Sequence, residues 1–261
     1  MRRVLVTGMS GLIGTAVRAR LEGRWALRAL NRRPVAGVET HQADIGDLAA
    51  IAPAFRDVDA VVHLAANVAS AEGAPGWEAV LRDNVVGTYN VFEAARRAAV
   101  KRVIYASSGA TVSRIEADAP YAALAAGRYD EVAEWPMLTH ESPPRPNGLY
   151  GCSKIWGEAL ARHFADTTPM SMICLRIGHV SEGDRPVKPR EFSVWCSRRD
   201  IAQAIERALE APDSLRFDVF FITSDNKWSY RDIEHARAVL GYVPEDRAED
   251  HRARRTDTAM P

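Results

Sequence analysis

Short apolar runs alternate with longer amphipathic segments along most of this chain. The runs are unbroken, which is typical of strands buried on both faces of a sheet. They lie at residues 4–6, 26–30, 60–64, 103–106, 172–175 and 219–222. Apolar positions at three- and four-residue spacing, which predict amphipathic helices, occupy residues 12–21, 77–99, 150–165 and 200–211. This alternation predicts an α/β fold with a doubly wound parallel sheet, in which a ligand lies at the carboxyl ends of the strands.

The composition is that of a globular protein without a strong surface field. The 261 residues are 47% hydrophobic, which is enough for the core of one large domain. The 34 basic and 34 acidic side chains balance. We therefore expect neither a nucleic acid partner nor a membrane partner.

The first residues of the chain, the length of its apolar stretches and its cysteines indicate the compartment. The chain starts directly with a strand-like run, which leaves no room for a signal peptide, and no apolar stretch is long enough to span a bilayer. The cysteines Cys152, Cys174 and Cys196 are too widely spaced for a zinc motif. We expect a cytoplasmic protein with reduced thiols and no metal.

A glycine-rich turn follows the first apolar run. Gly8, Gly11 and Gly14 stand at the first, fourth and seventh positions of the turn. Glycines at this spacing let backbone N–H groups approach a pyrophosphate at a helix N-terminus, and a side chain at Gly8 or Gly11 would block that approach. The alternative is that these glycines serve only the packing of helix against strand.

Tyr150 and Lys154 form a second candidate group. On a helix, positions four apart lie on one face, so both polar ends can point into one cleft. A phenol has a reference pKa of about 10, and a nearby ammonium lowers that pKa by stabilising the phenolate. Alone, such a pair could be a solvated surface contact, but the glycine turn upstream favours a proton-transfer pair.

Together these segments resemble the extended short-chain dehydrogenase/reductase superfamily, also named the NAD-dependent epimerase/dehydratase family. The resemblance covers residues 3–245. It rests on TGMSGLIG (7–14), ADI (43–45), HLAA (63–66), NVVGT (84–88), ASS (106–108), YGCSK (150–154) and LRIG (175–178), in the family's order. Three later stretches are most similar to uronate dehydrogenases and related sugar or sugar-phosphate 1-dehydrogenases. These stretches are RIG (176–178), WCSRRD (195–200) and TSDN (223–226).

The resemblance implies a Rossmann-like doubly wound parallel sheet with a small C-terminal substrate-binding portion. We expect a single domain over residues 1–245, with substrate-binding elements mainly at 109–149 and 179–245. A charged, flexible tail is expected at 246–261.

Residues 114–146 break the regular alternation and carry Tyr121, Tyr129 and Trp135. This segment is either a lid whose aromatic side chains close over substrate, or a surface insertion packed by its own aromatic side chains.

The resemblance also implies a site for a nicotinamide dinucleotide. The residues that match the family's cofactor contacts are Gly8, Gly11, Leu12, Ile13, Gly14, Asn31, Arg32, Asp44, Ile45, Leu64, Ala65, Ala66, Tyr150, Lys154 and Ile177. Ile177 and Gly178 would bring backbone to the nicotinamide carboxamide, and Asn84 would buttress the active site. His63 is expected to be a packed core histidine.

The second strand ends on Asn31 where the family usually has an acidic residue for the adenosine ribose. Asn31, followed by Arg32 and Arg33, would attract a 2′-phosphate. The cofactor is therefore NAD or NADP, and this segment favours NADP, although the relatives suggested by the resemblance mostly use NAD. Asp44 resembles the acceptor of the adenine amino group; the alternative is a cap on the helix that begins near Asp47.

For the reaction itself, the resemblance implies that Tyr150 is the general base and that Lys154 holds the nicotinamide ribose and keeps Tyr150 acidic. Ser108 would fix the reacting oxygen, with Ser107 as the alternative. The implied substrate contacts are Ser108, Gly109, Tyr150, His179 and Arg190.

Arg190 lies five residues before Trp195, the spacing of a substrate arginine in uronate dehydrogenases. A guanidinium can hold a carboxylate or phosphate through two parallel hydrogen bonds. Arg185 and Lys188 precede it in the same segment. The alternative is a basic surface loop.

The sequence thus predicts an NAD(P)-dependent oxidoreductase that oxidises the C1 hemiacetal of an acidic sugar, a uronate or sugar phosphate, to a lactone. One alternative is a nucleotide-sugar epimerase or dehydratase that retains NAD. A second is a non-catalytic dinucleotide-sensing protein. The resemblance implies a homodimer or higher homo-oligomer.

Overall fold

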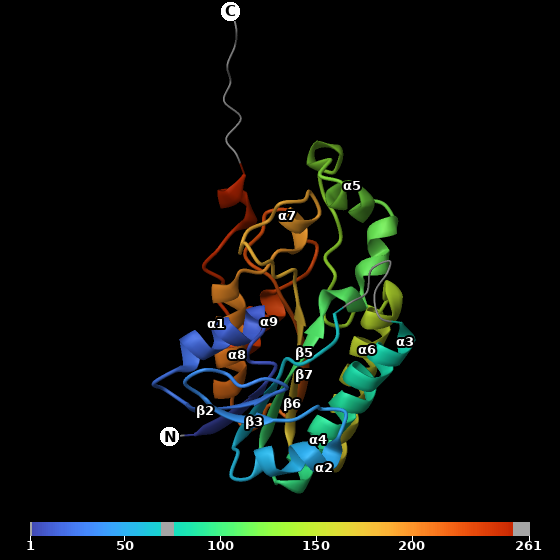
Figure 1. Cartoon of the computed structure of the whole chain (residues 1–261). Helices are drawn as coiled ribbons and strands as arrows, with labels where there is room; N and C mark the ends of the chain where they lie inside the picture. The colour runs from blue at the N-terminus through green and yellow to red at the C-terminus, as the bar shows by residue number, and fades with distance from the viewer. Residues whose placement is uncertain (1, 69–75, 253–261) are drawn as a thin grey trace, which may run out of the picture.

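One parallel β-sheet runs through the centre of the molecule (Figure 1). The computed structural model describes residues 2–68 and 76–252. Among these residues the sheet has seven strands in the order β3-β2-β1-β4-β5-β6-β7, all paired in parallel. The strands are β1 (Arg3–Thr7), β2 (Ala26–Asn31), β3 (Glu39–Gln42), β4 (Ala60–His63), β5 (Arg102–Ser108), β6 (Ser171–Ile177) and β7 (Phe217–Ile222). This is the predicted Rossmann-like sheet.

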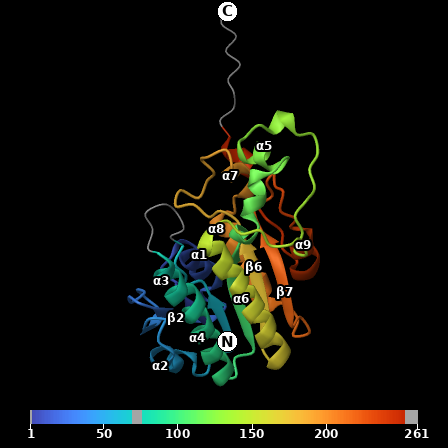
Figure 2. The ribbon, with the colours of Figure 1, turned by 90° about the vertical axis from the view of Figure 1, so that its right-hand side faces the viewer.

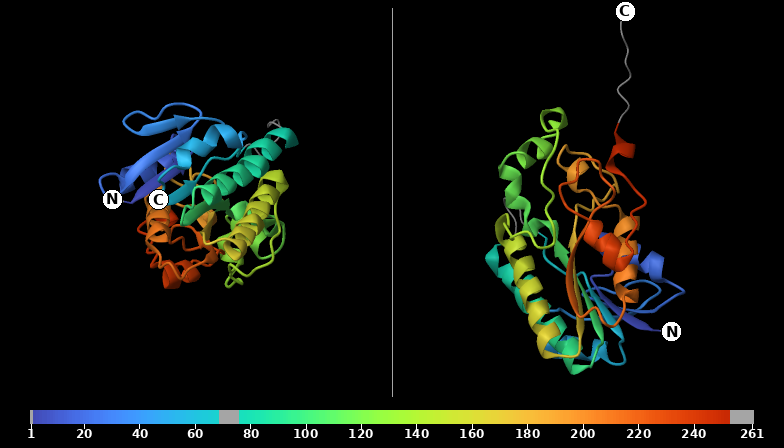
Figure 3. Two further views of the ribbon diagram at one scale, coloured as in Figure 1. Left: turned by 90° about the horizontal axis from the view of Figure 1, so that it is seen from below. Right: turned by 180° about the vertical axis from the view of Figure 1, so that it is seen from behind.

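Helices cover both faces of this sheet (Figure 3). The α-helices are α1 (Leu12–Leu21), α2 (Leu48–Ile51), α3 (Trp77–Val80), α4 (Gly87–Arg97), α5 (Tyr121–Ala125), α6 (Gly148–Thr167), α7 (Glu191–Val194), α8 (Arg198–Glu210) and α9 (Glu234–Leu240). A π-helical segment, η2 (Leu81–Val86), joins α3 to α4. The 3-10 helices are η1 (Ala52–Phe55), η3 (Gly109–Thr111), η4 (Ser113–Ala117), η5 (Tyr129–Glu131) and η6 (Ala248–His251).

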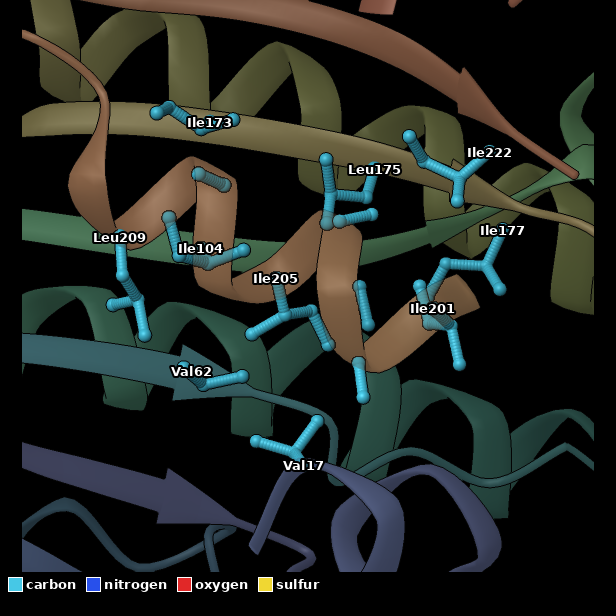
Figure 4. Close-up of a cluster of buried hydrophobic side chains, with 14 of the residues drawn as sticks. Val17, Val62, Ile104, Ile173, Leu175, Ile177, Ile201, Ile205, Leu209 and Ile222 are labelled. Carbon is cyan, nitrogen blue, oxygen red and sulfur yellow. The ribbon is translucent and has the colours of Figure 1, made fainter. Parts of the chain in front are cut away.

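Two hydrophobic cores result, one on each face. On one face, α1, α8 and α9 pack on alternate strand residues; Val62, Ile104 and Ile205 belong to this core (Figure 4). On the other face, α2, α4 and α6 bury a second set that includes Phe92 and Phe164. Because each strand side chain enters one core or the other, the strands read as unbroken apolar runs.

The predicted strands and helices are all present, and the differences have physical reasons. Strand β3 was not predicted because its sequence, ETHQ, is polar and lies partly exposed at the sheet edge. The helix predicted at residues 77–99 is interrupted by η2, whose extra residue per turn is not visible in apolar spacing. Helix α9 spans only 7 residues, too short for a clear period.

A third cluster lies at the end of the molecule that carries α5 and α7 (Figure 2). In it, Tyr121 packs edge-on to Tyr230, and Tyr129 stacks on Trp228 at 3.9 Å between ring centroids. Trp135 donates its indole N–H to a backbone carbonyl of the same later segment, at 2.9 Å. None of the three predicted lid aromatics lines the cavity described below, which favours the packed-insertion interpretation.

The described part of the expected tail is held on the domain. Asp246 forms an ion pair with Arg199, and Ala248 is fully buried. Residues 246–252 therefore pack, whereas 253–261 lie outside the described residues. Among the helices of residues 2–68 and 76–252, none has the length and apolarity to cross a membrane.

The guanidinium of Arg102 closes the C-terminal end of α8, and we expect its loss to destabilise the fold. It is 5% exposed and donates to the carbonyls of Leu209 at 3.0 Å and Pro212 at 3.0 Å. Arg102→Met should lower the free energy of unfolding in urea by about 2 kcal/mol, because buried carbonyls lose a charged donor.

The matched control is Arg207→Met on α8. The Arg207 side chain is 47% exposed. This substitution should change the free energy of unfolding by about 0.5 kcal/mol or less. Equal effects of the two substitutions would contradict the role assigned to Arg102.

Candidate active site

A cavity of about 1280 Å³ opens at the carboxyl ends of β1, β4, β5 and β6. Pockets for single drug-sized ligands measure about 300–1,000 Å³, so this cavity has room for a dinucleotide and a small substrate. All the predicted cofactor, catalytic and substrate residues line it. The structure thus brings together positions that lie far apart in sequence, as expected at the crevice of an open parallel sheet. That each of them binds a ligand stays a prediction.

In the glycine turn between β1 and α1, some glycines are required by packing and one leaves the backbone open to a ligand. Gly8 has φ +71°, and a Cβ there would lie 2.9 Å from Ala65 N. A Cβ on Gly14 would lie 2.5 Å from Met9 O. Gly8 and Gly14 are therefore required by packing, whereas a Cβ on Gly11 would meet only Gly8 O, at 3.3 Å.

Gly11 is the N-cap of α1 and makes no side-chain cap. The first N–H groups of α1 have no partner within the helix. They and the positive end of the helix dipole suit the pyrophosphate of a dinucleotide.

Asn31 supports this turn from the end of β2. Its Oδ1 accepts from Met9 N at 2.9 Å, and its Nδ2 donates to Ser10 Oγ at 2.9 Å. The amide is 7% exposed, so its polar atoms are already engaged and it positions the turn. Arg32 and Arg33, both exposed, are the cations on this side of the cavity.

On the adenine side, Asp44 is not a helix cap. Its Oδ1 accepts from Gly46 N at 2.8 Å, whereas Asp47 caps α2 by accepting from Ala50 N at 3.0 Å. Asp44 therefore remains available as the predicted acceptor beside Ile45.

His63 is a core histidine, as expected. Its ring nitrogens bond Thr7 Oγ1 at 2.8 Å and Thr88 Oγ1 at 3.1 Å. Burial lowers the pKa of His63 to about 3, so the ring is neutral and fixes the ends of β1 and β4 near the cofactor turn.

Helix α6 carries Tyr150, Lys154 and Glu158 along one face, at intervals of four residues. Lys154 is 3% exposed, and its Nζ donates to Ala106 O at 2.7 Å. Burial lowers the pKa of Lys154 to about 7, with the Glu158 carboxylate acting in the opposite direction.

The pKa of Tyr150 is raised by burial, with a hydrogen bond with Ser108 acting in the opposite direction. The phenol is therefore protonated at rest. The Lys154 ammonium lies 5.5 Å from the Tyr150 ring centroid. That Lys154 keeps Tyr150 acidic stays a prediction.

The structure distinguishes the two candidate serines. Ser107 is 2% exposed and donates to Glu158 Oε1 at 2.5 Å. Both serines line the cavity beside Tyr150, but Glu158 holds the Ser107 hydroxyl and Ser108 is the more exposed of the two, which favours Ser108 as the serine that reaches a substrate oxygen.

Glu158 was not predicted, although its position eight residues after Tyr150 could have suggested it. Its carboxylate holds the guanidinium of Arg176 through two hydrogen bonds, at 2.9 and 2.8 Å. With Ser107, this buried pair ties α6 to β5 and β6 behind the catalytic side chains.

Asn84 lies in the π-helical segment and buttresses α6. Its side chain bonds both the N–H and the carbonyl of Asn67, at 2.7 and 2.9 Å, and donates to Ser153 Oγ at 3.1 Å. The resemblance implied this supporting role, and the contacts fit it.

At the predicted substrate end, Arg190 lines the cavity, but its guanidinium is already bonded to a carboxylate. Its Nε and Nη2 both bond the Glu116 carboxylate, which also accepts from Tyr230 at 2.6 Å. Nearby, His179 Nε2 lies 3.4 Å from Glu191, and burial lowers the pKa of His179.

Glu116 and Arg231 were not predicted. Both come from segments with no regular pattern, and only the fold brings them to Arg190.

The sequence matches the model of the NAD dependent epimerase/dehydratase family over residues 4–211. It is 32% identical to the NAD-dependent glucose-6-phosphate dehydrogenase of Haloferax volcanii, over 93% of each chain. It is 32% identical to the L-arabinose 1-dehydrogenase (NAD(P)(+)) of the same organism, over 94% of this chain and 97% of that one. The structure is similar to the crystal structure of uronate dehydrogenase from Agrobacterium tumefaciens, with a TM-score of 0.81 and 32% identity, covering 100% of this chain and 91% of that one.

Burial of Lys154 predicts a pH-dependent stability difference. Below pH 7 the folded protein must hold a buried charge. Between a folded pKa of about 7 and an unfolded pKa of about 10.4, the unfolded chain binds more protons, so wild-type stability from this group rises with pH. Lys154→Met should therefore gain most over wild type at pH 6.5, and the gain should shrink towards pH 9.5, in urea unfolding.

The exposed Lys101→Met serves as the control for general loss of a positive charge. A stability difference for Lys154→Met that stays constant from pH 6.5 to 9.5 would show that Lys154 is not held in a desolvated site.

Proposed function

Because the chain belongs to the NAD-dependent epimerase/dehydratase family, we propose that it is an NAD-dependent dehydrogenase that oxidises the C1 hydroxyl of an acidic sugar to the lactone. The observation that carries this proposal is one cavity that holds Tyr150, Lys154 and Ser108 at one place and Arg190 at another. A candidate proton-transfer group and a cationic side chain therefore line the same cavity.

The proposed substrate class rests on charge and on the relatives. Two of the similar proteins are named for anionic substrates, glucose 6-phosphate and a uronate, and one for the neutral sugar L-arabinose. The guanidiniums of Arg190 and Arg231 line the cavity, which favours an acid. Neutral sugars offer no group that two guanidiniums would bind preferentially.

The glycine turn, Asp44 and the N–H groups at the start of α1 would hold the adenosine and pyrophosphate, and Lys154 the nicotinamide ribose. Bound NAD+ supplies the hydride acceptor. The hydroxyl of Ser108 donates to the substrate oxygen and orients it. Tyr150 Oη takes the hydroxyl proton as the C1 hydride leaves, and this requires the phenolate.

The raised pKa of Tyr150 sets a condition on that step. The phenolate forms only when positive charge lies beside it, and Lys154 supplies such charge when it is protonated. Since the pKa of Lys154 is lowered to about 7 by burial, anything that stabilises its ammonium, such as ribose hydroxyls accepting from Nζ, also favours the phenolate.

A direct test is cofactor reduction by a panel of aldoses, uronates and sugar phosphates, followed at the absorbance of NADH. Wild type should form NADH with an acidic sugar. Tyr150→Phe should lower kcat/KM by about 100-fold or more, because it removes the proton acceptor, while the Kd for NAD+ changes far less. An enzyme that converts a nucleotide sugar without net NADH formation would instead be an epimerase or dehydratase.

For the cofactor, we propose that Arg32 also admits NADP+ by pairing with the 2′-phosphate. This goes beyond the NAD dependence in the family's name, although the similar L-arabinose 1-dehydrogenase is named for NAD(P)(+). Arg32→Ala should lower kcat/KM for NADP+ by about 10-fold and leave kcat/KM for NAD+ within about twofold. A wild-type enzyme that already discriminates strongly against NADP+ would exclude this role for Arg32.

A homodimeric state and a cytoplasmic location stay predictions from the family resemblance and from the sequence. The oligomeric state is measured directly by light scattering of the purified chain.

A further inference from the structure

The guanidinium of Arg231 is buried in the wall of the cavity without a full set of partners. Arg231 is 2% exposed, and it follows Tyr230 in the segment between β7 and α9. Its guanidinium donates a hydrogen bond from Nη2 to Gly109 O, at 3.3 Å. Its Nε has no partner among the described residues. A buried guanidinium in this condition is unfavourable unless another acceptor completes its shell.

The chain makes room for this guanidinium at one residue beside the catalytic serine. A Cβ on Gly109 would lie 2.1 Å from Arg231 Nη1. Gly109 directly follows Ser108, so the plane of the guanidinium lies against the backbone next to the proposed oxygen-binding hydroxyl.

Glu116 does not neutralise both arginines at this end of the cavity. The Arg190 fork occupies the carboxylate with two hydrogen bonds. The nearest Arg231 nitrogen, Nη2, lies 3.7 Å from Glu116 Oε1, beyond a good hydrogen bond. Glu191 also acts on Arg190, whereas Glu116, at 3.7 Å, is the carboxylate nearest to Arg231. Arg231 therefore has no carboxylate at hydrogen-bonding distance among the described residues, and an anionic ligand can supply one.

We propose that Arg231 is a substrate-binding and specificity-determining residue that contacts the acid group of the sugar, while Glu116 holds Arg190 in place beside it. The proposal rests on the function proposed above and adds to it the residue that selects an acid. Arg190 cannot offer its Nε and Nη2 to substrate unless it leaves Glu116, whereas the Nε of Arg231 has no partner among the described residues and its Nη2 makes one bond of 3.3 Å.

The test compares three sugars that share one ring and differ at the far end: D-glucuronate, D-glucose 6-phosphate and D-glucose. Steady-state kinetics with NAD+ are measured for wild type, Arg231→Gln and Arg231→Lys. The control is Arg237→Gln, a half-buried arginine of α9 that pairs with Asp225 and does not line the cavity. Binding of each sugar to the protein saturated with NADH is measured by calorimetry.

Arg231→Gln should lower kcat/KM for the better acidic sugar by about 30-fold, mainly through KM, and weaken its binding to the NADH complex to a similar extent. The value for D-glucose and the Kd for NADH should stay within about twofold of wild type. Arg231→Lys should lie between wild type and Arg231→Gln, because it keeps the charge but loses the planar fork. Arg237→Gln should behave as wild type.

Equal losses for acidic and neutral sugars, or no loss for either, would overturn the role of Arg231. If Arg231→Gln fails to bind NADH or to fold, Arg231→Lys decides. If Arg231→Lys then prefers acidic sugars as strongly as wild type does, the role of the Arg231 guanidinium fork is wrong. If wild type reduces no NAD+ but binds an acidic sugar through Arg231, the proposed oxidation is wrong and this inference stands. If wild type binds no acidic sugar, the inference is wrong.

Discussion

The hydrogen bond from Lys154 Nζ to Ala106 O holds α6 against the central strand β5, and the geometry of the candidate active site depends on it. Burying an amine is unfavourable, as the lowered pKa of Lys154 shows, so its donors need acceptors. The carbonyl of Ala106 is one of them, at 2.7 Å. One turn further along α6, Glu158 bonds Ser107 on β5 and Arg176 on β6. These polar contacts fix the position of α6 along β5 and β6 and thereby place Tyr150 beside Ser108.

Close packing between α6 and β5 supports the same position of the helix on the sheet. A Cβ on Gly157 would lie 2.2 Å from the Tyr105 hydroxyl of β5, so α6 approaches the sheet closely only where a glycine stands. Tyr105 in turn lies under the Lys154 ammonium, 4.9 Å from Nζ to ring centroid. The proton-transfer pair is therefore held by a rigid helix and strand rather than by loops, as precise positioning requires.

Most of the fold and the cofactor half of the site could be predicted from sequence because they depend on local signals. Strand runs, the glycine turn and the four-residue spacing of Tyr150 and Lys154 are all visible within a few residues of one another. The substrate half depends on Glu116, Arg190 and Arg231, which come from η4, the start of α7 and the segment before α9. No local pattern marks Glu116 or Arg231. The upward shift of the Tyr150 pKa by burial could not be foreseen for a related reason: the sequence shows the neighbouring lysine but not the degree of burial.

In the proposed reaction the hydride leaves C1 of an acidic sugar, the carbon whose hydroxyl faces Tyr150. The most direct measurement uses D-glucuronate or D-glucose 6-phosphate deuterated at C1, with NAD+, and analyses both products by mass spectrometry. The deuterium should appear in the reduced nicotinamide, and the sugar product should be the lactone or its open acid without deuterium. Deuterium retained in the oxidised sugar would contradict the proposed reaction.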